Sequence, residues 1–201
     1  VENDQIRFGL SAIQNVGEKA AISIIEKRIE AEKYTTLFDL TDKVDLHQVN
    51  KKVLEALTKA GALDSIEGNR AAKFLTIEEA IATSSQIKQE KANGQISLFG
   101  GASESEDTAL QDQRVIMNID EWHESEILKN EKEVLGVYLT GHPLVKYEDH
   151  VKALSTHNTE QLKYVSNDEQ IKIAGLISEV RKRTAKASGK RYAIITLEDF
   201  E

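Results

Sequence analysis

A chain of 201 residues, 40% hydrophobic and 30% charged, is long enough to bury one large or two small hydrophobic cores. It contains no cysteine, which excludes disulfides and argues against a structural zinc site. No apolar run approaches the roughly 20 residues that cross a bilayer, and no signal-peptide pattern opens the chain. We therefore expect a cytoplasmic protein without membrane contact.

The formal net charge of −8 argues against nucleic-acid binding by the chain as a whole, but the charge is unevenly distributed. Residues 1–91 carry a net charge of −2, residues 92–133 carry −7, and residues 134–201 carry +1. The acidity therefore belongs mostly to the central segment. The two flanking regions can still bind phosphates locally.

The first predicted pair of helices lies near the N-terminus. Ser11 is expected to cap a short helix that runs through Ile13. A longer amphipathic helix follows, and its apolar face is expected to consist of Ile22, Ile25 and Ile29. With the turn between them, these two helices are predicted to form a helix-hairpin-helix.

The turn of this pair is the first candidate DNA-binding site, and it contains Asn15, Val16, Gly17 and Lys19. A glycine lets the backbone approach a phosphate closely, and the N–H groups at the start of the next helix point toward it. Lys19 adds a positive charge. Contacts of this kind hold the DNA backbone without reading its base sequence.

A second pair of helices is predicted further along the chain. After a short helix capped by Thr35 or Thr36, Asn50 caps another helix and Asn69 starts the next one. The candidate DNA-binding residues of this pair are Asn50, Lys51, Lys52, Lys59 and Gly61. In a lone helix–glycine–helix the glycine is more often a simple helix C-cap. Two such pairs in one chain favour hairpins that together hold both strands of a duplex.

The acidic central segment contains an apolar cluster formed by Gln95, Ile96, Ser97, Leu98 and Phe99. Leu98 and Phe99 cannot form a core by themselves. We expect them either to enter a pocket on a partner protein or to pack back on their own domain as a hydrophobic staple. On a partner, each anchor is worth about 1.5–3 kcal/mol when buried, and Gln95 supplies directional hydrogen bonds.

Residues 122–139 are predicted to form an amphipathic helix that stops at Gly141, His142 and Pro143. The five histidines of the chain show no metal-ligand spacing, and no acid or nucleophile is spaced to act with His142. We therefore predict no metal site and no catalytic residue in this chain.

The last part of the chain changes to the two-residue periodicity of strands. Residues 170–177 and 192–197 are predicted to pair as a hairpin. Residues 181–191, which lie between them, contain six cations and no acid, and Arg181, Arg183, Lys190 and Arg191 are the candidate DNA-binding residues. A lone hairpin is marginal in water, so we expect residues 181–191 to be a mobile loop.

These stretches, in this order, resemble the alpha-subunit family of bacterial DNA polymerase III. Residues 7–20 and 50–64 are similar to the two hairpins of that family's tandem helix-hairpin-helix domain. Residues 94–100 resemble its sliding-clamp-binding motif, and residues 131–144 resemble a stretch that follows the motif. The basic hairpin is similar to the start of the family's OB-fold. The resemblance covers essentially the whole chain.

The resemblance implies a mainly α fold with a small β-hairpin from a truncated OB-fold. It divides the chain into a tandem helix-hairpin-helix domain at residues 1–84, a flexible acidic linker with the clamp motif at 85–120, a helical connector at 121–165 and an incomplete OB-fold at 166–201. We expect the chain to be a C-terminal fragment of the longer polymerase.

The function implied is that of a non-catalytic part of a replicative, DNA-directed DNA polymerase. The partners implied are double-stranded DNA, the sliding clamp, other replisome subunits and, through a complete OB-fold, single-stranded DNA. No cofactor is expected in this fragment, because the family's Mg²⁺-binding catalytic carboxylates lie upstream of Val1. The alternatives are a tandem hairpin module of a DNA repair nuclease or ligase and, favoured by the acidic balance, a protein-binding helical scaffold.

Overall fold

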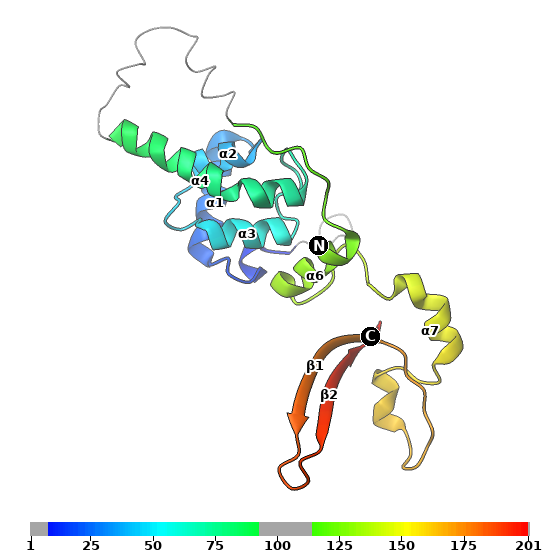
Figure 1. The fold of residues 1–201 in the computed structure, drawn as a ribbon. Coiled ribbons are helices and arrows are strands. Elements are labelled where there is room, and N and C mark those ends of the chain that lie inside the picture. The colour runs from blue at the N-terminus through cyan, green and yellow to red at the C-terminus, as the bar shows by residue number, and fades with distance from the viewer. Residues whose placement is uncertain (1–7, 93–113, 201) are drawn as a thin grey trace. The chain divides into compact units, whose positions relative to one another are not determined.

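The computed structural model describes residues 8–92 and 114–200 (Figure 1). The chain divides into two compact units, Val1–Tyr138 and Leu139–Glu201. The described residues are mainly helical and contain one two-stranded antiparallel sheet near the C-terminus. This confirms the predicted fold class.

The first unit consists of helices that flank two tight turns. The elements in chain order are η1 (Leu10–Ala12), α1 (Glu18–Ala31), α2 (Leu37–Lys43), α3 (Lys51–Lys59), α4 (Arg70–Ala92) and α6 (Glu124–Leu135). The first turn lies between η1 and α1, and the second lies between α3 and α4. Both predicted pairs of helices are therefore present.

Side-chain oxygens cap three of these helices at residues that the sequence predicts. Thr36 and Asn50 each accept a hydrogen bond from the backbone N–H three residues further on. Asn69 caps α4 in the same way, at 2.8 Å. The prediction for Ser11 is wrong, because η1 already begins at Leu10 and Gly9 occupies the N-cap position.

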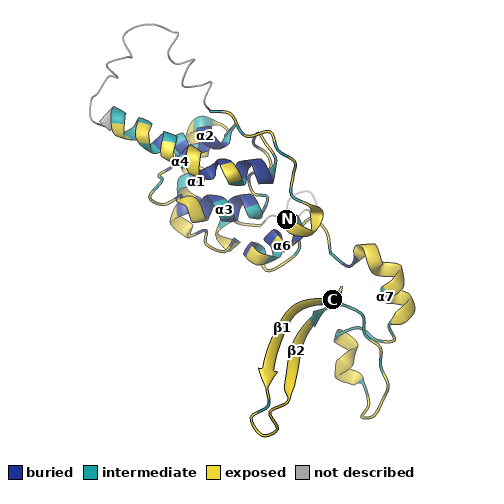
Figure 2. Ribbon diagram, viewed as in Figure 1, coloured by how far each residue is buried: buried dark blue, intermediate teal, exposed yellow. Residues whose placement is uncertain are grey.

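The core of the first unit lies where α2 and α3 pack against α4 (Figure 2). Its fully buried aliphatic side chains include Leu37, Leu40, Val49, Leu54, Leu57 and Ile77. Burying one such side chain contributes about 1.5–3 kcal/mol. This shared core holds the second pair of helices together.

The buried face of α1 differs from the predicted one. Ile22, Ile25 and Ile29 are 45%, 40% and 73% exposed, whereas Ala20 and Ile24 are buried. Isoleucine occurs on two faces of this helix, so its periodicity alone could not select between them. The small side chain of Ala20 allows α1 to approach the core closely on the face that packing selects.

The helix predicted at residues 122–139 is shorter than expected. α6 begins after His123, whose ring nitrogen accepts a hydrogen bond from the N–H of Ser125. Gly136 ends the helix with a φ of +76° and donates its N–H to the carbonyl of Lys132. A glycine in the left-handed region is a common helix terminator. The expected stop at residues 141–143 is therefore wrong.

The division of the chain differs from the four segments that were expected. α4 continues to Ala92, beyond the expected boundary at residue 84. α6 buries Val134 in the core of the first unit, together with the two pairs of helices. The chain divides after Tyr138. α6 is therefore part of the first unit, called the hairpin unit below because it contains both helix-hairpin-helix pairs. The packing contact that places it there is not visible in the sequence periodicity.

The second unit contains short helices followed by a β-hairpin. Its elements are η2 (Val145–Tyr147), α7 (Glu148–Leu154), η3 (Glu160–Tyr164), β1 (Leu176–Thr184) and β2 (Arg191–Glu198). Among its described residues only Leu144 and Asp199 are buried. The Asp199 carboxylate accepts hydrogen bonds from the N–H of Thr159 at 2.6 Å and from its hydroxyl at 2.8 Å. This contact joins the end of β2 to the start of η3.

The β-hairpin is longer at its tip than the sequence predicts. The ladder pairs Arg183 with Tyr192 and Thr184 with Arg191, and the N–H of Ala185 donates to the carbonyl of Lys190. Residues 181–184 and Arg191 therefore belong to the strands, and only residues 185–190 connect them. Residues 170–175, predicted to be strand, precede β1.

Candidate nucleic-acid interface

The first turn presents its backbone to solvent while its apolar side chains face the core. Ile13 and Val16 are buried, and the N–H of Val16 donates to the carbonyl of Ile13 at 3.0 Å. Asn15, between them in the chain, is exposed and has a φ of +68°, a left-handed conformation that asparagine tolerates. The turn therefore bulges outward at the position where a phosphate contact is predicted.

The start of α1 is open. Gly17 is the N-cap, so it offers no side chain to the N–H groups of the first turn, and a Cβ at Gly17 would meet nothing within 4 Å. Lys19 is exposed and has no ion-pair partner among the described residues. Glu18 is also exposed in this turn. The first turn thus combines a bare helix N-terminus with one unpaired cation.

The second turn has a different geometry. Gly61 has a φ of +75°, its N–H donates to the carbonyl of Thr58, and the next N–H donates to the carbonyl of Leu57. This is the Schellman arrangement of a helix C-cap. A Cβ on Gly61 would lie 2.2 Å from Nη2 of Arg70. The backbone at Gly61 therefore closely approaches a side chain of the same chain.

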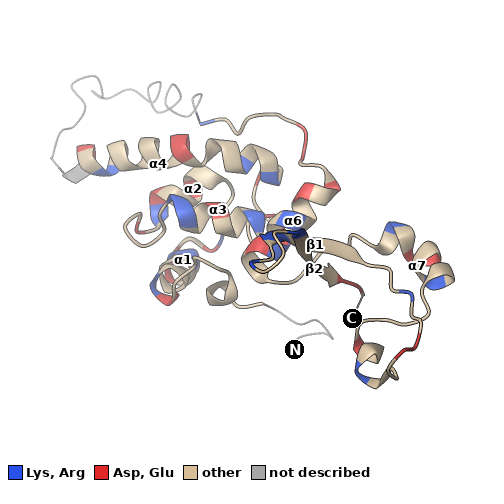
Figure 3. Ribbon diagram, turned by 60° about the horizontal axis from the view of Figure 1, so that its bottom comes forward, with Lys and Arg blue, Asp and Glu red and all other residues tan. Residues whose placement is uncertain are grey.

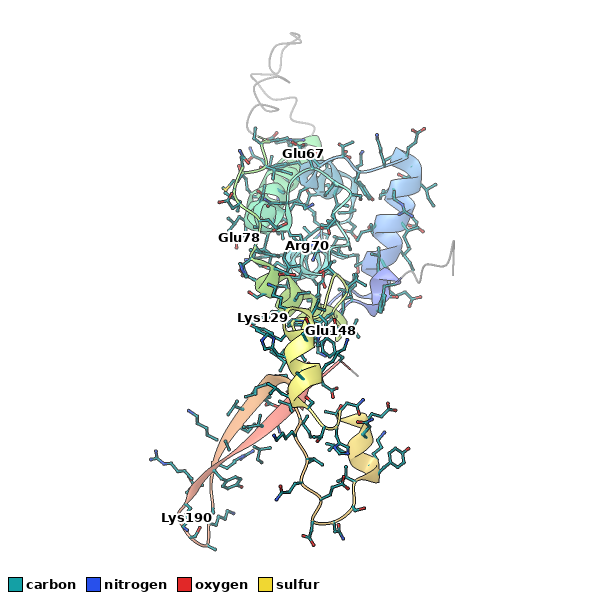
Figure 4. All side chains as sticks on the ribbon, turned by 90° about the vertical axis from the view of Figure 1, so that its right-hand side faces the viewer. Glu67, Arg70, Glu78, Lys129, Glu148 and Lys190 are labelled. Atoms are coloured by element: carbon teal, nitrogen blue, oxygen red, sulfur yellow. The ribbon has the colours of Figure 1, made fainter. Side chains whose placement is uncertain are left out.

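Arg70, at the start of α4, lies inside the hairpin unit (Figure 4). Its guanidinium donates to Asp64 at 2.7 Å and to Glu131 of α6 at 2.9 Å. The Arg70 side chain is 9% exposed and that of Glu131 is fully buried. Burial acts to lower the pKa of Arg70, but the bonds to the two carboxylates raise it above the ordinary value. The arginine is therefore held charged and in a fixed position.

The N-terminus of α4 is fully capped by the chain itself. The Glu121 carboxylate accepts the backbone N–H of Arg70 at 2.8 Å and that of Ala71 at 3.0 Å. Asn69 accepts the N–H of Ala72 and donates its amide to the carbonyl of Ile119. Burial alone would raise the pKa of Glu121, but the backbone donors lower it below the ordinary glutamate value.

The lysines of the second pair differ in their surroundings. Lys51 forms a hydrogen-bonded ion pair with Glu78, which raises the pKa of Lys51, and Lys59 pairs with Glu133 at 2.8 Å. Lys52 is exposed and has no ion-pair partner among the residues that the structure describes. Figure 3 shows that Lys and Arg are interspersed with Asp and Glu over these helices.

Several residues of this region were missed by sequence reasoning. They are Asp64, Arg70, Lys73, Glu121 and Glu131. Lys73 is buried, its ammonium donates to the carbonyls of Leu63 and Ile66, and burial lowers its pKa. No short motif marks residues that meet only after folding. A buried Lys or Arg could have been suspected only from its place on the inner face of α4.

The basic hairpin of the second unit presents the cations that the sequence predicts. Arg183 lies opposite Tyr192 in the ladder, so a cation and a half-exposed aromatic ring share one face. Arg181 pairs with Glu179 at 2.6 Å. Lys190 lies at the tip, and Arg191 begins β2 (Figure 4).

The proposed clamp-binding residues 95–99 lie outside the described residues. The chain on either side of residues 93–113 belongs to the first unit, because α4 ends at Ala92 and Arg114 forms an ion pair with Asp42 at 2.7 Å. In the described ranges, no three His, Cys, Asp or Glu residues are placed to hold a metal ion. None of the helices described is long and apolar enough to cross a membrane.

Known proteins match this chain along almost all of its length. A sequence-family model described as "Helix-hairpin-helix motif" matches residues 1–73, which include both turns. The chain is 34% identical to DNA polymerase III subunit alpha of Vibrio cholerae and 36% identical to that of Pseudomonas aeruginosa, over 98% of its own length in each case. The whole length of this chain is 33% identical to part of the subunit of Borreliella burgdorferi.

The turns and their flanking helices place the first unit in the helix-hairpin-helix class. Nearly the whole chain is similar to one part of the DNA polymerase III alpha subunits of these organisms. It spans only 17% of the Vibrio cholerae protein and 18% of the Pseudomonas aeruginosa protein.

Proposed function

We propose that this chain is a non-catalytic part of a replicative DNA polymerase, which holds duplex DNA and attaches the polymerase to the sliding clamp. The observation that carries the proposal is the match of 98% of the chain, at 34% identity, to a DNA polymerase III subunit alpha. The helix-hairpin-helix match over residues 1–73 supports the DNA contact. DNA synthesis and its Mg²⁺ site are assigned to a part of the parent protein outside this chain.

The duplex contact is a backbone contact. At the first turn, the N–H groups of α1 and the exposed Lys19 are available to a phosphate oxygen, and Gly17 leaves room for close approach. Lys52 is a further cation that is available to a phosphate. Contacts of this kind give affinity that falls with salt and depends little on base sequence.

The clamp contact is assigned to residues 95–99. The apolar anchors Leu98 and Phe99 enter a pocket on the clamp, and Gln95 sets the register. The neighbouring chain at Ala92 and Arg114 belongs to the hairpin unit. Two modest contacts on one chain raise the effective concentration of each other, so the polymerase stays bound over many additions.

The basic hairpin of the second unit is assigned to single-stranded DNA, as part of a complete OB-fold in the parent protein. The shared face of Arg183 and Tyr192 supports this, because base stacking on aromatic rings and charge attraction to phosphates are the usual means of binding single strands. Other replisome subunits are proposed as partners of the parent protein.

Two titrations of the 201-residue chain test the proposal. One measures its affinity for a labelled duplex at several salt concentrations, and the other measures its affinity for a bacterial sliding clamp. Salt-dependent duplex binding together with clamp binding supports the proposal. Duplex binding without clamp affinity would point to a repair module. Absence of salt-dependent duplex binding, whether or not the clamp binds, would reject the DNA-holding role.

A further inference from the structure

We infer that the two hairpins are not equivalent: the first contacts the DNA backbone, whereas the second is occupied by the chain's own carboxylates and serves to hold residues 114–135 in place. The inference rests on the proposed duplex binding and specifies which surface performs it. Four features of the second hairpin lead to it.

The first feature is the N-terminus of α4. Glu121 accepts two backbone N–H groups there, from Arg70 and Ala71, and Asn69 accepts the N–H of Ala72. These are the donors that a phosphate oxygen would use at a helix N-terminus. A carboxylate of the chain thus occupies the place of the phosphate. A DNA phosphate would have to displace it and leave that carboxylate without its backbone donors.

The second feature is the glycine of the turn. A hairpin glycine is useful for DNA binding when its bare backbone faces the ligand. At Gly61 the Arg70 guanidinium occupies that space, since a Cβ there would lie 2.2 Å from Nη2. At Gly17 a Cβ would meet nothing within 4 Å. The two glycines therefore serve different purposes.

The third feature is the state of the cations. Lys51 and Lys59, the first and last residues of α3, pair with Glu78 and Glu133. Binding of phosphate by either lysine would require that pair to be given up. Lys19 has no such partner among the described residues. Lys52, the second residue of α3, is also unpaired among the described residues, but the lysines at both ends of α3 are paired, whereas the lysine beside the first turn is not.

The fourth feature is that the second hairpin already has a binding partner in the same chain. Residues before and within α6 contact the second hairpin: Glu121 caps α4, Glu131 binds Arg70, and Glu133 binds Lys59. The same helix also accepts the N–H of Gln14 at the carbonyl of Val134, at 2.8 Å. α6 therefore fixes the first turn relative to the second. The role of the second hairpin is to position the first.

Duplex titration of three forms of the chain tests this inference: the wild type, Lys19→Ala and Lys59→Ala. Each variant loses one positive charge, so non-specific electrostatics change equally. We expect Lys19→Ala to weaken binding roughly 3- to 10-fold at low salt and to reduce the slope of log K against log salt by about one. We expect Lys59→Ala to change the affinity by less than about twofold. Equal losses in both variants, or a larger loss in Lys59→Ala, would overturn the inference while leaving the proposed duplex binding intact.

Amide hydrogen exchange supplies a second readout that needs no substitution. In the free chain, the amides of Arg70 and Ala71 should already be protected by Glu121. On addition of duplex, protection should rise at Glu18, Lys19 and Ala20 and stay unchanged at the start of α4. New protection confined to Arg70 and Ala71 would assign the contact to the second hairpin. Absence of salt-dependent binding by the wild-type chain would reject the proposed function itself, and with it this inference.

Discussion

The guanidinium of Arg70 and the carboxylate of Glu131 lie 61 residues apart in the chain and form a 2.9 Å ion pair inside the hairpin unit. Glu131 is fully buried and Arg70 is 9% exposed. Asp64 supplies a second carboxylate, so the Arg70 guanidinium forms ion pairs with two side chains. This pair connects α6 to the second turn.

Removal of Glu131 should therefore destabilise the first unit strongly. Glu131→Ala leaves a buried guanidinium with one of its two carboxylates, and breaking a buried pair in this way costs about 3–5 kcal/mol. Urea unfolding followed by circular dichroism measures the change. Glu133→Ala is the matched control, because its side chain is 54% exposed and an exposed pair is worth less than about 1 kcal/mol. Similar losses in both variants would contradict the buried role of Glu131.

Glu121 should make the stability of the first unit dependent on pH in the acid range. Backbone donors hold its pKa below the unfolded value of 4.5. A group whose folded pKa is lowered stabilises the fold above its unfolded pKa, and this contribution is lost as the pH falls through the folded pKa. We expect Glu121→Gln to be less stable than the wild type at neutral pH and the difference to shrink on acidification below 4.5. A difference independent of pH would show that the charge of Glu121 is not what caps α4.

The two glycines give a matched pair of substitutions. Gly61→Ala places a side chain at a φ of +75° and against Arg70, which should cost at least about 1–2 kcal/mol of unfolding free energy. Gly17→Ala should change stability by less than about 1 kcal/mol, because the site is open and lies in the extended region. Thermal unfolding measures both. In duplex titrations the Gly17 variant should nevertheless bind more weakly, because its methyl group obstructs the approaching phosphate.

Glu18 offers a test in the opposite direction. Its exposed carboxylate lies in the first turn of α1, next to the proposed phosphate contact. Glu18→Gln removes a like charge, so duplex affinity at low salt should increase by a few-fold, and the gain should disappear at high salt. The same substitution at Glu26, further along α1 and also exposed, is the control. Equal gains at both positions would indicate a net-charge effect without a local contact.

The clamp assignment depends on two side chains. Replacement of Leu98 and Phe99 by alanine should abolish binding to the sliding clamp, because it removes both apolar anchors. The unfolding transition should be unchanged. Leu110→Ala, an apolar substitution in the same acidic stretch, should retain clamp binding. Loss of the folded state in the double variant would favour the alternative in which the pair packs on its own domain.

Features that depend only on neighbouring residues can be predicted from the sequence of this protein. Asn50 and Asn69 cap their helices as predicted, and Thr36 is the cap of the two threonines considered, because an N-cap bond spans only three residues. The order of the motifs was sufficient to indicate the family, and the strand periodicity located the hairpin, although not its full length.

Which surfaces are buried against other parts of the chain depends on how distant segments pack. Isoleucine on two faces of α1 left its buried face undetermined, and no local pattern marked α6 as part of the hairpin unit. A single carboxylate, Glu121, in an acidic segment carries no sequence signal. It meets the start of α4 across about 50 residues of chain. Such contacts arise from packing between distant segments, and they leave the turn at Gly17 open while they close the turn at Gly61.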